Sequence, residues 1–401
     1  MKNPTQNVLN FSNVPSFTSG LQEAIDALPE SGGVVEVPPG IYTLQRHVQL
    51  RNNVLIRGSG NASRITRTAE VSSPLAQEAN DGDVAVQVES AKAFNPGMEI
   101  SIFDTTQRGW HATHAVIRGI DDNILHLDQP INTNRPCLRE RNGTVAHAFS
   151  AFVAWEVHDC GLQSLSVDGG ERFDQSVFAD FTISAIHFVR TIDARIRDCV
   201  VRHWPADGVS VQGGSGTIVT NCLSQGCLGH GFHPGTSVKH SLWINNIGRE
   251  NGRDGLYFCM YVRHSVVSNS TFHGNGRYGI GGLGDGGDQY NLVANNTCVD
   301  NARHGIEASG GKNNTISSNI CLNNSQEEAG KYSGIGLCDV TGMTVNANRC
   351  LDDQEISTQG YGIEEKGESN QNLIVANHCQ GNLCGGIMTI GDRTKCTENL
   401  E

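Results

Sequence analysis

Asp254-Gly255-Leu256-Tyr257 is one of a series of similar four-residue openings in the second half of the sequence. The series consists of Ser184-Ala185-Ile186-His187, Asp207-Gly208-Val209-Ser210, His230-Gly231-Phe232-His233, Asp254-Gly255-Leu256-Tyr257, Tyr278-Gly279-Ile280-Gly281, His304-Gly305-Ile306-Glu307, Ser333-Gly334-Ile335-Gly336 and Tyr361-Gly362-Ile363-Glu364. The step is 23 or 24 residues at first and 26 to 29 residues later. Short β-branched runs with period-2 alternation fill each unit, and no segment between them has the helical periodicity of a βαβ crossover. A repeat of this length with about three short strands predicts one coil of a parallel β-helix per unit.

A second signal keeps the same phase as these openings. It reads Asn296-Thr297-Cys298, Asn319-Ile320-Cys321, Asn348-Arg349-Cys350 and Asn377-His378-Cys379. Equivalent positions on successive coils lie ~4.8 Å apart. We therefore expect the asparagines to stack and hydrogen-bond at a turn, and the cysteines to stack as reduced thiols in the interior. The paired spacing of a structural zinc site is absent.

The first half of the sequence fits the same architecture less regularly. Residues 18–28 have the pattern of a short amphipathic helix with a Ser19/Gln22 capping box, suited to cover the open N-terminal end of a solenoid. Residues from about 68 to 140 break the rhythm with runs typical of antiparallel strands. We predict an all-β chain with three parts: an N-terminal cap and first coils over 1–67, a small inserted β subdomain over 68–148, and the main coils over 149–401.

Composition limits the classes of partner. A net charge of −13 leaves no global basic field for a nucleic acid, and no apolar run approaches the ~18–20 residues of a membrane span. Glycine occurs 47 times and proline only 11 times, which excludes collagen and proline-rich disorder and favours many tight corners. The N-terminus has no apolar segment typical of a secretory signal, so the localisation stays open.

The outer face of the predicted coils carries unusual side chains. Because strand side chains alternate, the residue after each apolar position of the openings should point outward. This outward column is His187, Ser210, His233, Tyr257, Gly281, Glu307, Gly336 and Glu364, and the residues before the glycines add His230, Asp254, Tyr278 and His304. Solenoid surfaces usually carry Thr, Ser, Asn and Lys, so these rings and carboxylates favour a binding cleft. The alternative is that the rings simply stack along a β surface.

Arginines form a further column one residue earlier. Arg253, Arg277 and Arg303 precede the openings of three successive units. At an effective dielectric of ~20, charges one coil apart repel by about 3 kcal/mol per pair before solvent screening. Such a row suits a repeating anion, since arginine binds carboxylate or sulfate in bidentate fashion. The alternative is internal neutralisation by Asp254, Asp285 and Asp300.

A polymer with a charge on each sugar matches a long cationic strip. For a uronate, histidine, tyrosine and arginine suit abstraction of the proton at C5, next to a carboxylate that a cation must neutralise. Histidine or a deprotonated tyrosine can remove this proton. A second acid, often tyrosine, then protonates the departing O4 or returns a proton to C5 from the other face. Elimination defines a lyase, and return of the proton defines an epimerase.

Three stretches resemble the catalytic coils of bacterial mannuronan (alginate) C5-epimerases: Gly229-His230-Gly231-Phe232-His233-Pro234-Gly235-Thr236, Asn251-Gly252-Arg253-Asp254-Gly255-Leu256 and Asn275-Gly276-Arg277-Tyr278-Gly279. The resemblance spans about residues 180–330, and Gly33–Gly40 resembles the wider pectate-lyase-like superfamily. It implies a right-handed parallel β-helix, an anionic, uronate-containing polysaccharide as substrate, and a secreted or periplasmic location.

The signature coil of that family, Tyr-Gly-Phe-Asp-Pro-His, is altered in this sequence. Asp254 falls on a family active-site aspartate and Pro234 is shared. The Tyr, Asp and His of the signature are replaced by His230, His233 and Gly235. We therefore expect base and acid to be reassigned, with His233 or His230 as base and Tyr257 as acid.

Other residues complete the predicted site, and two other functions stay open. We expect substrate contacts from Arg253, Arg277, Arg303, Tyr278, Glu307, His304, Lys239 and Arg263. No cofactor is expected, although the stretch 281–288 has the glycines and carboxylates of a calcium loop. The alternatives are an inverting glycoside hydrolase that uses carboxylates of the same cleft, and a non-catalytic polysaccharide-binding or adhesin solenoid.

Overall fold

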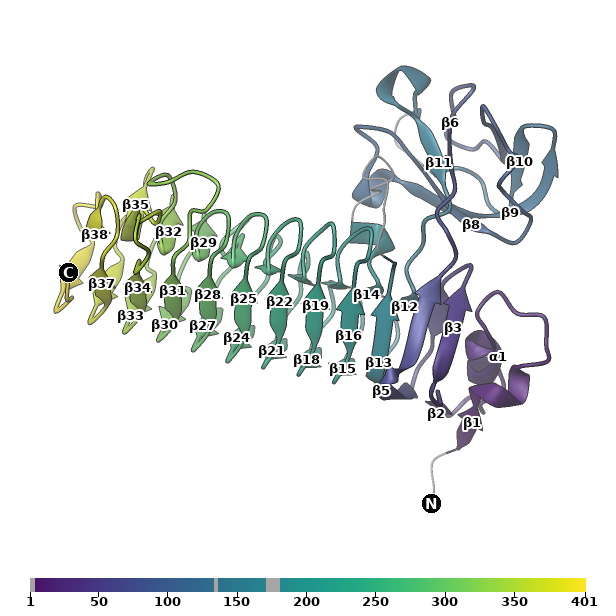
Figure 1. Cartoon of the computed structure of the whole chain (residues 1–401), viewed down its shortest axis with the longest axis horizontal. Coiled ribbons are helices and arrows are strands. Elements are labelled where there is room, and N and C mark those ends of the chain that lie inside the picture. Colours follow the sequence, from purple (N-terminus) through teal and green to yellow (C-terminus); the bar gives the residue numbers. More distant parts are fainter. Residues whose placement is uncertain (1–3, 133–135, 171–180) are drawn as a thin grey trace.

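Stacked coils build an elongated solenoid that runs from an N-terminal cap to the C-terminus (Figure 1). The computed structural model describes residues 4–132, 136–170 and 181–401. In these residues nearly all regular structure is β-strand, and the strands of the coils pair in parallel. The predicted parallel β-helix is confirmed.

One face of the solenoid is a parallel sheet to which most coils contribute the strand that begins at or just after the repeated glycine. We call it the glycine-face sheet. Its strands, in spatial order, are β4 (Val48–Leu50), β12 (Phe152–Trp155), β14 (Ile186–Val189), β17 (Val209–Gln212), β20 (Phe232–Pro234), β23 (Leu256–Tyr257), β26 (Ile280–Gly281), β29 (Ile306–Ser309), β32 (Ile335–Cys338), β35 (Tyr361–Lys366) and β38 (Gly385–Met388).

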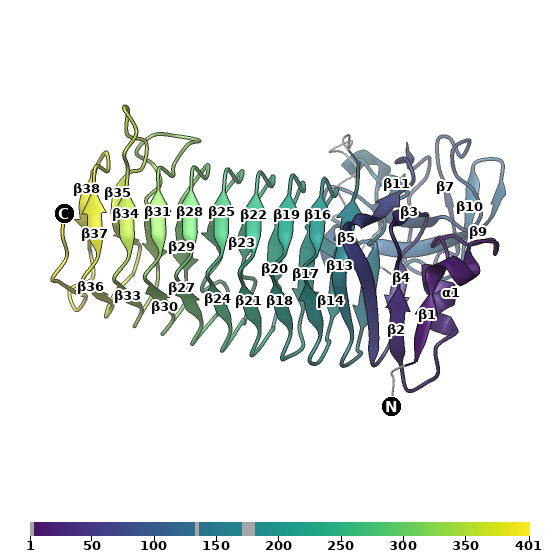
Figure 2. The same cartoon turned by 60° about the horizontal axis from the view of Figure 1, so that its bottom comes forward.

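A larger parallel sheet closes the rest of the wall (Figure 2). It begins with β1 (Thr5–Asn7), β2 (Gly33–Glu36), β3 (Gly40–Leu44), β5 (Val54–Arg67) and β13 (Gly161–Asp168). One row continues through β15 (Arg195–Arg197), β18 (Ile218–Thr220), β21 (Leu242–Ile244), β24 (Val266–Ser268), β27 (Leu292–Ala294), β30 (Thr315–Ser317), β33 (Thr344–Asn346), β36 (Leu373–Val375) and β39 (Lys395–Thr397). The other row is β16 (Val200–Arg202), β19 (Leu223–Gln225), β22 (Ile247–Arg249), β25 (Thr271–His273), β28 (Thr297–Val299), β31 (Ile320–Leu322), β34 (Arg349–Leu351) and β37 (His378–Gln380).

The two predicted columns of asparagine and cysteine both form. Cys298, Cys321 and Cys350 are in register on successive strands and fully buried. At the adjoining turn, the side-chain amide of Asn319 donates to the side-chain oxygen of Asn348 at 3.0 Å. The other asparagines of this column form the same bond from coil to coil. Buried amides that satisfy one another from coil to coil fix the register of the coils.

The repeated glycine is needed for close contact between coils. A Cβ added at Gly255 would lie 2.7 Å from the carbonyl oxygen of Gly279, and one added at Gly279 would lie 2.6 Å from that of Gly305. Both separations are shorter than real Cβ contacts, so a side chain there would force the coils apart. The glycine column is therefore a requirement of packing.

The N-terminal end is covered by α1 (Leu21–Asp26), after the 3-10 turn η1 (Val8–Phe11). Leu21 and Ile25 of this helix are fully buried against the first coils, as expected for a cap. The predicted Ser19/Gln22 capping box is wrong. The N-cap is Gly20, and the hydroxyl of Thr18 accepts the Gln22 amide at 3.2 Å while Ser19 bonds elsewhere.

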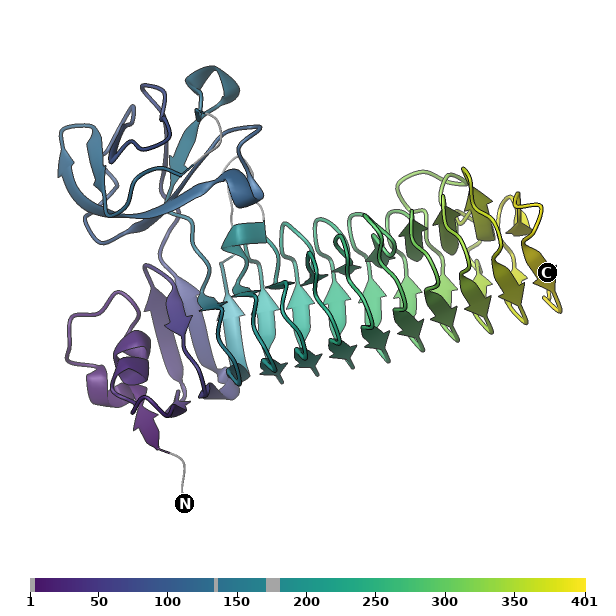
Figure 3. The ribbon, with the colours of Figure 1, turned by 180° about the vertical axis from the view of Figure 1, so that it is seen from behind.

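An antiparallel sheet stands to one side of the N-terminal coils (Figures 1 and 3). It consists of β6 (Ser72–Pro74), β7 (Ala85–Gln87), β8 (Glu99–Phe103), β9 (Thr113–Asp121), β10 (Ile124–Leu127) and β11 (Thr144–Ala146), with the 3-10 turns η2 (Gly109–His111) and η3 (Arg139–Arg141). It has a hydrophobic cluster of its own, separate from that of the coils. The chain returns to the coils before β12, and the short turn η5 (Phe181–Ile183) precedes β14. The domain boundaries at 67/68 and 148/149 stay predictions.

No helix in the described ranges is long and apolar enough to cross a membrane.

Candidate functional site

The register that the site depends on is the predicted one. Phe232 and Leu256 are fully buried and paired with each other on adjacent strands of the glycine-face sheet. Their neighbours His233 and Tyr257 therefore point away from the core, as does His187 two coils earlier. His233 is nonetheless only 3% exposed, so other side chains cover this part of the outer face.

His233 is the centre of a buried Asp–His–Cys arrangement. Its Nδ1 lies 2.7 Å from Oδ2 of Asp207, and its ring also hydrogen-bonds to the thiol of Cys259. Burial disfavours a charged ring, but the bonds to Asp207 and Cys259 outweigh it and raise the pKa of His233 to about 10. The Cys259 thiol is held in turn by the hydroxyl of Thr236 at 3.2 Å. His233 is thus already protonated at neutral pH. It is therefore a less suitable base than His230, the other residue predicted for this role.

His230 forms the second histidine–aspartate pair. Its Nδ1 lies 3.2 Å from Oδ2 of Asp254, which is completely buried. The backbone amide of Asp254 donates to the same Nδ1 at 3.3 Å, and in a neutral ring with this bond the proton is on Nε2. Among the described residues Oδ2 of Asp254 has no hydrogen-bond partner, so it can accept a proton from Nδ1 in the other tautomer, in which Nε2 carries the free lone pair. The ring stacks on Tyr257 with a centroid distance of 4.5 Å and an interplanar angle of 13°.

Tyr257 is held as a protonated phenol. Its hydroxyl donates to Oδ2 of Asp285 at 3.0 Å. Burial and the nearby acidic groups, among them Asp285, raise the pKa of Tyr257 well above its ordinary value. Tyr257 therefore fits the predicted role of acid. We refer to His230, His233, Tyr257, Asp207 and Asp254 as the histidine cluster.

In the stretch 281–288, which has the composition of a calcium loop, the carboxylates accept hydrogen bonds from the protein itself. Asp285 accepts the Tyr257 hydroxyl, and Asp288 accepts the backbone amides of Val262 and Gly284 at 2.7 and 3.1 Å. Burial raises the pKa of Asp288 to about 8, which weakens it as a ligand for a hard cation. Within the described ranges, no group of three or more His, Cys, Asp or Glu side chains is arranged to hold a metal ion.

The predicted arginine row forms beside the cluster. The amide of Arg277 donates to the carbonyl of Arg253 at 3.1 Å, and that of Arg303 donates to the carbonyl of Arg277 at 2.8 Å. Arg277 lies 3.6 Å from Asp254, and Arg303 pairs with Glu327 at 2.7 Å. Internal partners therefore neutralise part of the row. The side chains of Arg277 and Arg303 remain about one third exposed and can still contact an anion.

The other predicted contact residues divide into two groups. Tyr278 stacks on His304 at 5.8 Å and lies under the Arg277 guanidinium at 5.0 Å, next to the row. The backbones of Lys239 and Arg263 form a parallel β-bridge with each other. This bridge belongs to a separate row of bridges, which comes after the glycine-face strands in each coil. In the described part of the chain, neither side chain hydrogen-bonds to the histidine cluster.

Glu307 is a buried carboxyl in the same region. Its Oε2 accepts the amide of Gly282 at 2.7 Å. Burial raises its pKa, and the nearby Asp254 adds to the shift. Glu307 can therefore hold a proton at a pH at which an ordinary glutamate is ionised.

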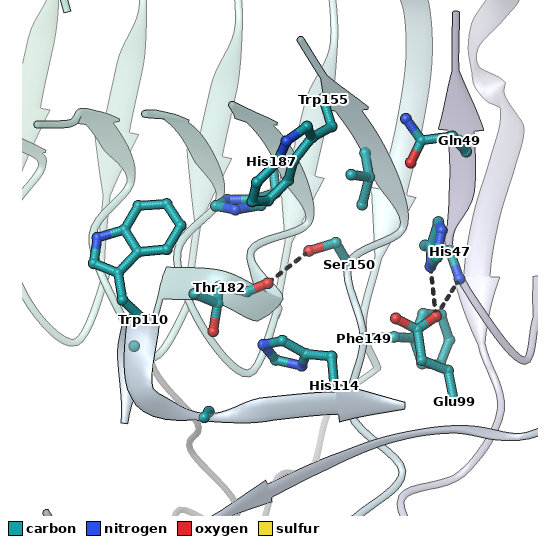
Figure 4. A pocket seen from close by; sticks show the side chains of 13 residues that line it. His47, Gln49, Glu99, Trp110, His114, Phe149, Ser150, Trp155, Thr182 and His187 are labelled. Atoms are coloured by element: carbon teal, nitrogen blue, oxygen red, sulfur yellow. Dashed lines mark hydrogen bonds and ion pairs between the residues drawn. The ribbon is translucent and has the colours of Figure 1, made fainter. Parts of the chain in front are cut away.

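A pocket of about 360 Å³ lies between the antiparallel sheet and the N-terminal coils, next to the histidine cluster (Figure 4). We call it the tryptophan pocket. Its lining consists of His47, Gln49, Glu99, Gly109, Trp110, Ala112, His114, Phe149, Ser150, Val153, Trp155, Thr182 and His187. A second hollow shares Trp110 and Trp155 with it and continues along Val189, Arg190, Gln212, Gly213, Thr236 and Ser237. Gln212 lies 3.5 Å from His233, so the hollows and the cluster are continuous.

Sequence reasoning found only His187 of this pocket. The pocket brings together two tryptophans, three histidines and a glutamate from segments up to 140 residues apart, because the inserted sheet folds back over the coils. No repeat phase connects the insertion to the coils, so spacing carried no signal for the pairing.

Comparison with known proteins addresses the fold. The family model described as "Right handed beta helix region" matches residues 184–325 and 243–399, which together cover more than half of the chain. The chain belongs to the right-handed β-helix family. A search of curated proteins found no relative of this β-helix chain.

Several solved structures have the same fold as this β-helix protein. The mannuronan C-5 epimerase AlgE6 A-module of Azotobacter vinelandii has a TM-score of 0.60 and 14% identity, covering 98% of each chain. The AlgE4 A-module of the same organism has a TM-score of 0.57 and 14% identity over 98% of this chain and all of that chain. An exopolygalacturonase of Thermotoga maritima has a TM-score of 0.57 and 12% identity over all of this chain and 93% of that chain. At these identities the likeness establishes the architecture and no more.

Proposed function

We propose that this protein is a polysaccharide-processing enzyme that abstracts the C5 proton of a uronate residue, acting as a lyase or a C5-epimerase. The observation that carries the proposal is the His230–Asp254 pair stacked on the protonated Tyr257, with Arg277 beside it. It supplies a base, an acid and a cation at one place on the outer face of the glycine-face sheet. Structural neighbours named as mannuronan C-5 epimerases support the choice of a uronate.

The proposed reaction uses these groups in sequence. In the His230 tautomer with its proton on Nδ1, toward Oδ2 of Asp254, Nε2 takes the C5 proton, and the electron pair of the C–H bond moves toward the substrate carboxylate. A guanidinium of the arginine row stabilises the developing negative charge, and Asp254 orients the imidazole and balances its new positive charge. The phenol of Tyr257 then gives its proton to O4 as the C4–O4 bond breaks, which leaves a C4=C5 double bond. Alternatively a water molecule on the opposite face gives a proton to C5, which inverts that carbon without cleavage, because Tyr257 stacks on His230 and lies on the same side of the sugar as the base.

Hydrolysis is the second candidate, and one observation favours it. Burial raises the pKa of Glu307, and the Asp254 carboxyl is near enough to add to the shift, so two carboxyls in different environments occur together, as a glycoside hydrolase requires. An exopolygalacturonase is among the proteins with a similar fold. The Asp254 carboxylate is engaged with His230 and Arg277, which makes it a poor base for water, and this places hydrolysis second.

A screen of anionic polymers separates these functions. Alginate, pectate, hyaluronan and chondroitin sulfate are incubated with the protein, and three signals are followed: ultraviolet absorbance of an unsaturated product, new reducing ends, and deuterium incorporated at C5 from heavy water. Absorbance indicates a lyase, deuterium without cleavage an epimerase, and reducing ends without absorbance a hydrolase. Retained binding with none of the three signals would contradict catalysis and support the adhesin alternative.

The variant Tyr257→Phe tests the assigned acid. It removes the phenol but keeps the ring that stacks on His230, so the fold should be preserved. Loss of general acid catalysis is expected to lower kcat by about 10²–10⁴-fold. Tyr290→Phe is the matched control, since Tyr290 also stacks on a histidine but is 54% exposed and distant from the cluster. Equal activity of Tyr257→Phe and Tyr290→Phe would remove Tyr257 from the mechanism.

A further inference from the structure

The tryptophan pocket has the form of a binding site for a small polar molecule with apolar faces. Its volume of about 360 Å³ lies in the range of ligand sites, about 300–1,000 Å³. Trp110 and Trp155 line it and are 49% and 44% exposed. Figure 4 shows Trp110 to the left of His187 and Trp155 overlapping it on the right, with Ser150 and His114 lower in the view. A pyranose ring combines an apolar C–H face that suits an indole with a rim of hydroxyls that suits these polar groups.

Two imidazole nitrogens in the pocket lack partners. His187 is only 4% exposed, and its Nδ1 is buried without a hydrogen bond. Nε2 of His114 is also buried without a bond. Native structures rarely leave such atoms unsatisfied, and a bound polar ligand or water is a usual reason.

The tautomer of His114 follows from its neighbour. Ser101 donates its hydroxyl proton to the carbonyl of Ala148 at 2.9 Å, so in its 2.8 Å contact with His114 its oxygen must accept. The proton of the neutral imidazole is then on Nδ1, and Nε2 is a free acceptor. A sugar hydroxyl is a donor that matches it.

The described residues that line the pocket carry no unpaired positive charge. Glu99 and His47 form an ion pair at 2.7 Å, and Arg190 of the adjoining hollow pairs with Glu156 at 2.9 Å. Burial lowers the pKa of His187 to about 3 and lowers that of His114, so both rings are neutral at physiological pH. Among the described lining residues nothing remains to neutralise a carboxylate. At the histidine cluster, in contrast, the arginine row is partly exposed.

We propose that the tryptophan pocket binds a neutral sugar unit between Trp110 and Trp155, so that the substrate is a heteropolysaccharide carrying neutral sugars next to its acidic ones. The substrate class rests on the proposed function, whereas binding of a neutral sugar stands on the pocket alone. The polymer would extend from the histidine cluster past Gln212 and the two tryptophans into the pocket.

Intrinsic fluorescence gives a direct test. Of the four tryptophans, Trp204 and Trp243 are fully buried, so a ligand-dependent change in emission reports Trp110 and Trp155. The probes are cellobiose and β-1,4-mannobiose as neutral disaccharides, and β-1,4-dimannuronate, which differs from mannobiose only by the carboxylates. We expect saturable changes with at least one neutral disaccharide, and at least tenfold weaker binding of dimannuronate.

Two variants locate the binding. Trp155→Ala and His187→Gln should each weaken binding of the neutral disaccharide about tenfold or more, while Tyr290→Ala, at an exposed ring elsewhere, should leave it unchanged. Thermal unfolding checks that each variant is folded. No saturable change with either neutral disaccharide, or tighter binding of dimannuronate in a Trp155-dependent manner, would overturn the proposal. Binding of a neutral disaccharide by a protein that is silent in the polymer screen would instead contradict the proposed catalysis and leave the sugar site standing.

Discussion

Two stacks of histidine and tyrosine rings on this solenoid differ in the surroundings of the histidine, and this difference distinguishes a candidate site from simple packing. At the histidine cluster, His230 stacks on Tyr257 at 4.5 Å, and at a turn on the same coils His264 stacks on Tyr290 at 5.4 Å. In the first stack His230 is buried and lies 3.2 Å from a buried aspartate. The second is exposed, and His264 has no carboxylate partner in the described residues.

Ring stacking alone is therefore a consequence of coil geometry. Any residue that recurs at the same point of successive coils meets its equivalent one coil away, as His240 and His264 do at 5.3 Å. His230 and its partner Asp254 are equivalent positions before the repeated glycine on successive coils, whereas Tyr257, which stacks on His230, belongs to the neighbouring outward column. The coincidence of the two columns marks the cluster as a candidate site.

The largest effect should come from removing the proposed base. His230→Gln retains a polar side chain of similar reach but has no basic nitrogen, so turnover in the polymer assay should fall by about 10²–10⁴-fold. His264→Gln is the matched control in the exposed stack and should keep nearly full activity. Equal turnover by the two variants would show that the two stacks do not differ in function.

The second prediction concerns the ion pair between His233 and Asp207. Asp207→Asn leaves a buried charged partner without its counterion, which typically costs about 3–5 kcal/mol of stability. The control Glu36→Gln removes an exposed pair with Arg57 and should cost about 0–1 kcal/mol. Urea unfolding of the three proteins at pH 6 measures both values, and a cost for Asp207→Asn no larger than the control would contradict an ionised pair.

The same pair gives a pH dependence whose sign is fixed. The pKa of His233 is raised from 6.5 to about 10, so its contribution is complete below pH 6.5 and is lost as the pH rises through about 10. The pKa of Asp207 is lowered from 3.8 to about 2, mainly by the two histidines against the cost of burial, so its contribution is complete above pH 3.8 and is lost toward pH 2. The stability difference between wild type and Asp207→Asn should therefore be largest between about pH 4 and 6.5. A difference that grows from pH 7 to 10 would contradict the assignment.

A third, smaller effect distinguishes Cys259 from the other thiols. Burial opposes a thiolate there, but the bond to His233 lowers the pKa of Cys259, whereas burial raises that of the exposed Cys396. Iodoacetamide at pH 7 should label Cys259 about tenfold faster than Cys396, although Cys259 is the less exposed of the two. Peptide mapping measures both rates in one sample. His233→Gln should abolish the preference, and faster labelling of Cys396 in the wild type would contradict the hydrogen bond.

The coil register could be predicted from the sequence because one glycine column and one apolar column recur in phase. That register placed His230, His233, Tyr257 and the arginines on one face. It could not show that Cys259 bonds to His233, because Cys259 lies two residues beyond the end of β23, where the period no longer fixes the direction of a side chain. It also could not place Trp110 or Glu99, since they belong to the inserted sheet, whose docking on the coils depends on tertiary packing.

The smallest effect is expected in the exposed stack. His240, His264 and Tyr290 all have left-handed backbone angles, with φ of 51°, 53° and 59°, a conformation that asparagine adopts more easily than a bulky ring. Tyr290→Asn therefore loses a ring contact of about 0.2–1 kcal/mol but relieves part of the backbone cost. The two changes oppose each other, and urea unfolding should show a net difference within about 0.5 kcal/mol, with activity unchanged. A loss of activity would mean that the exposed stack also contacts substrate, and the distinction between the two stacks would then rest on burial alone.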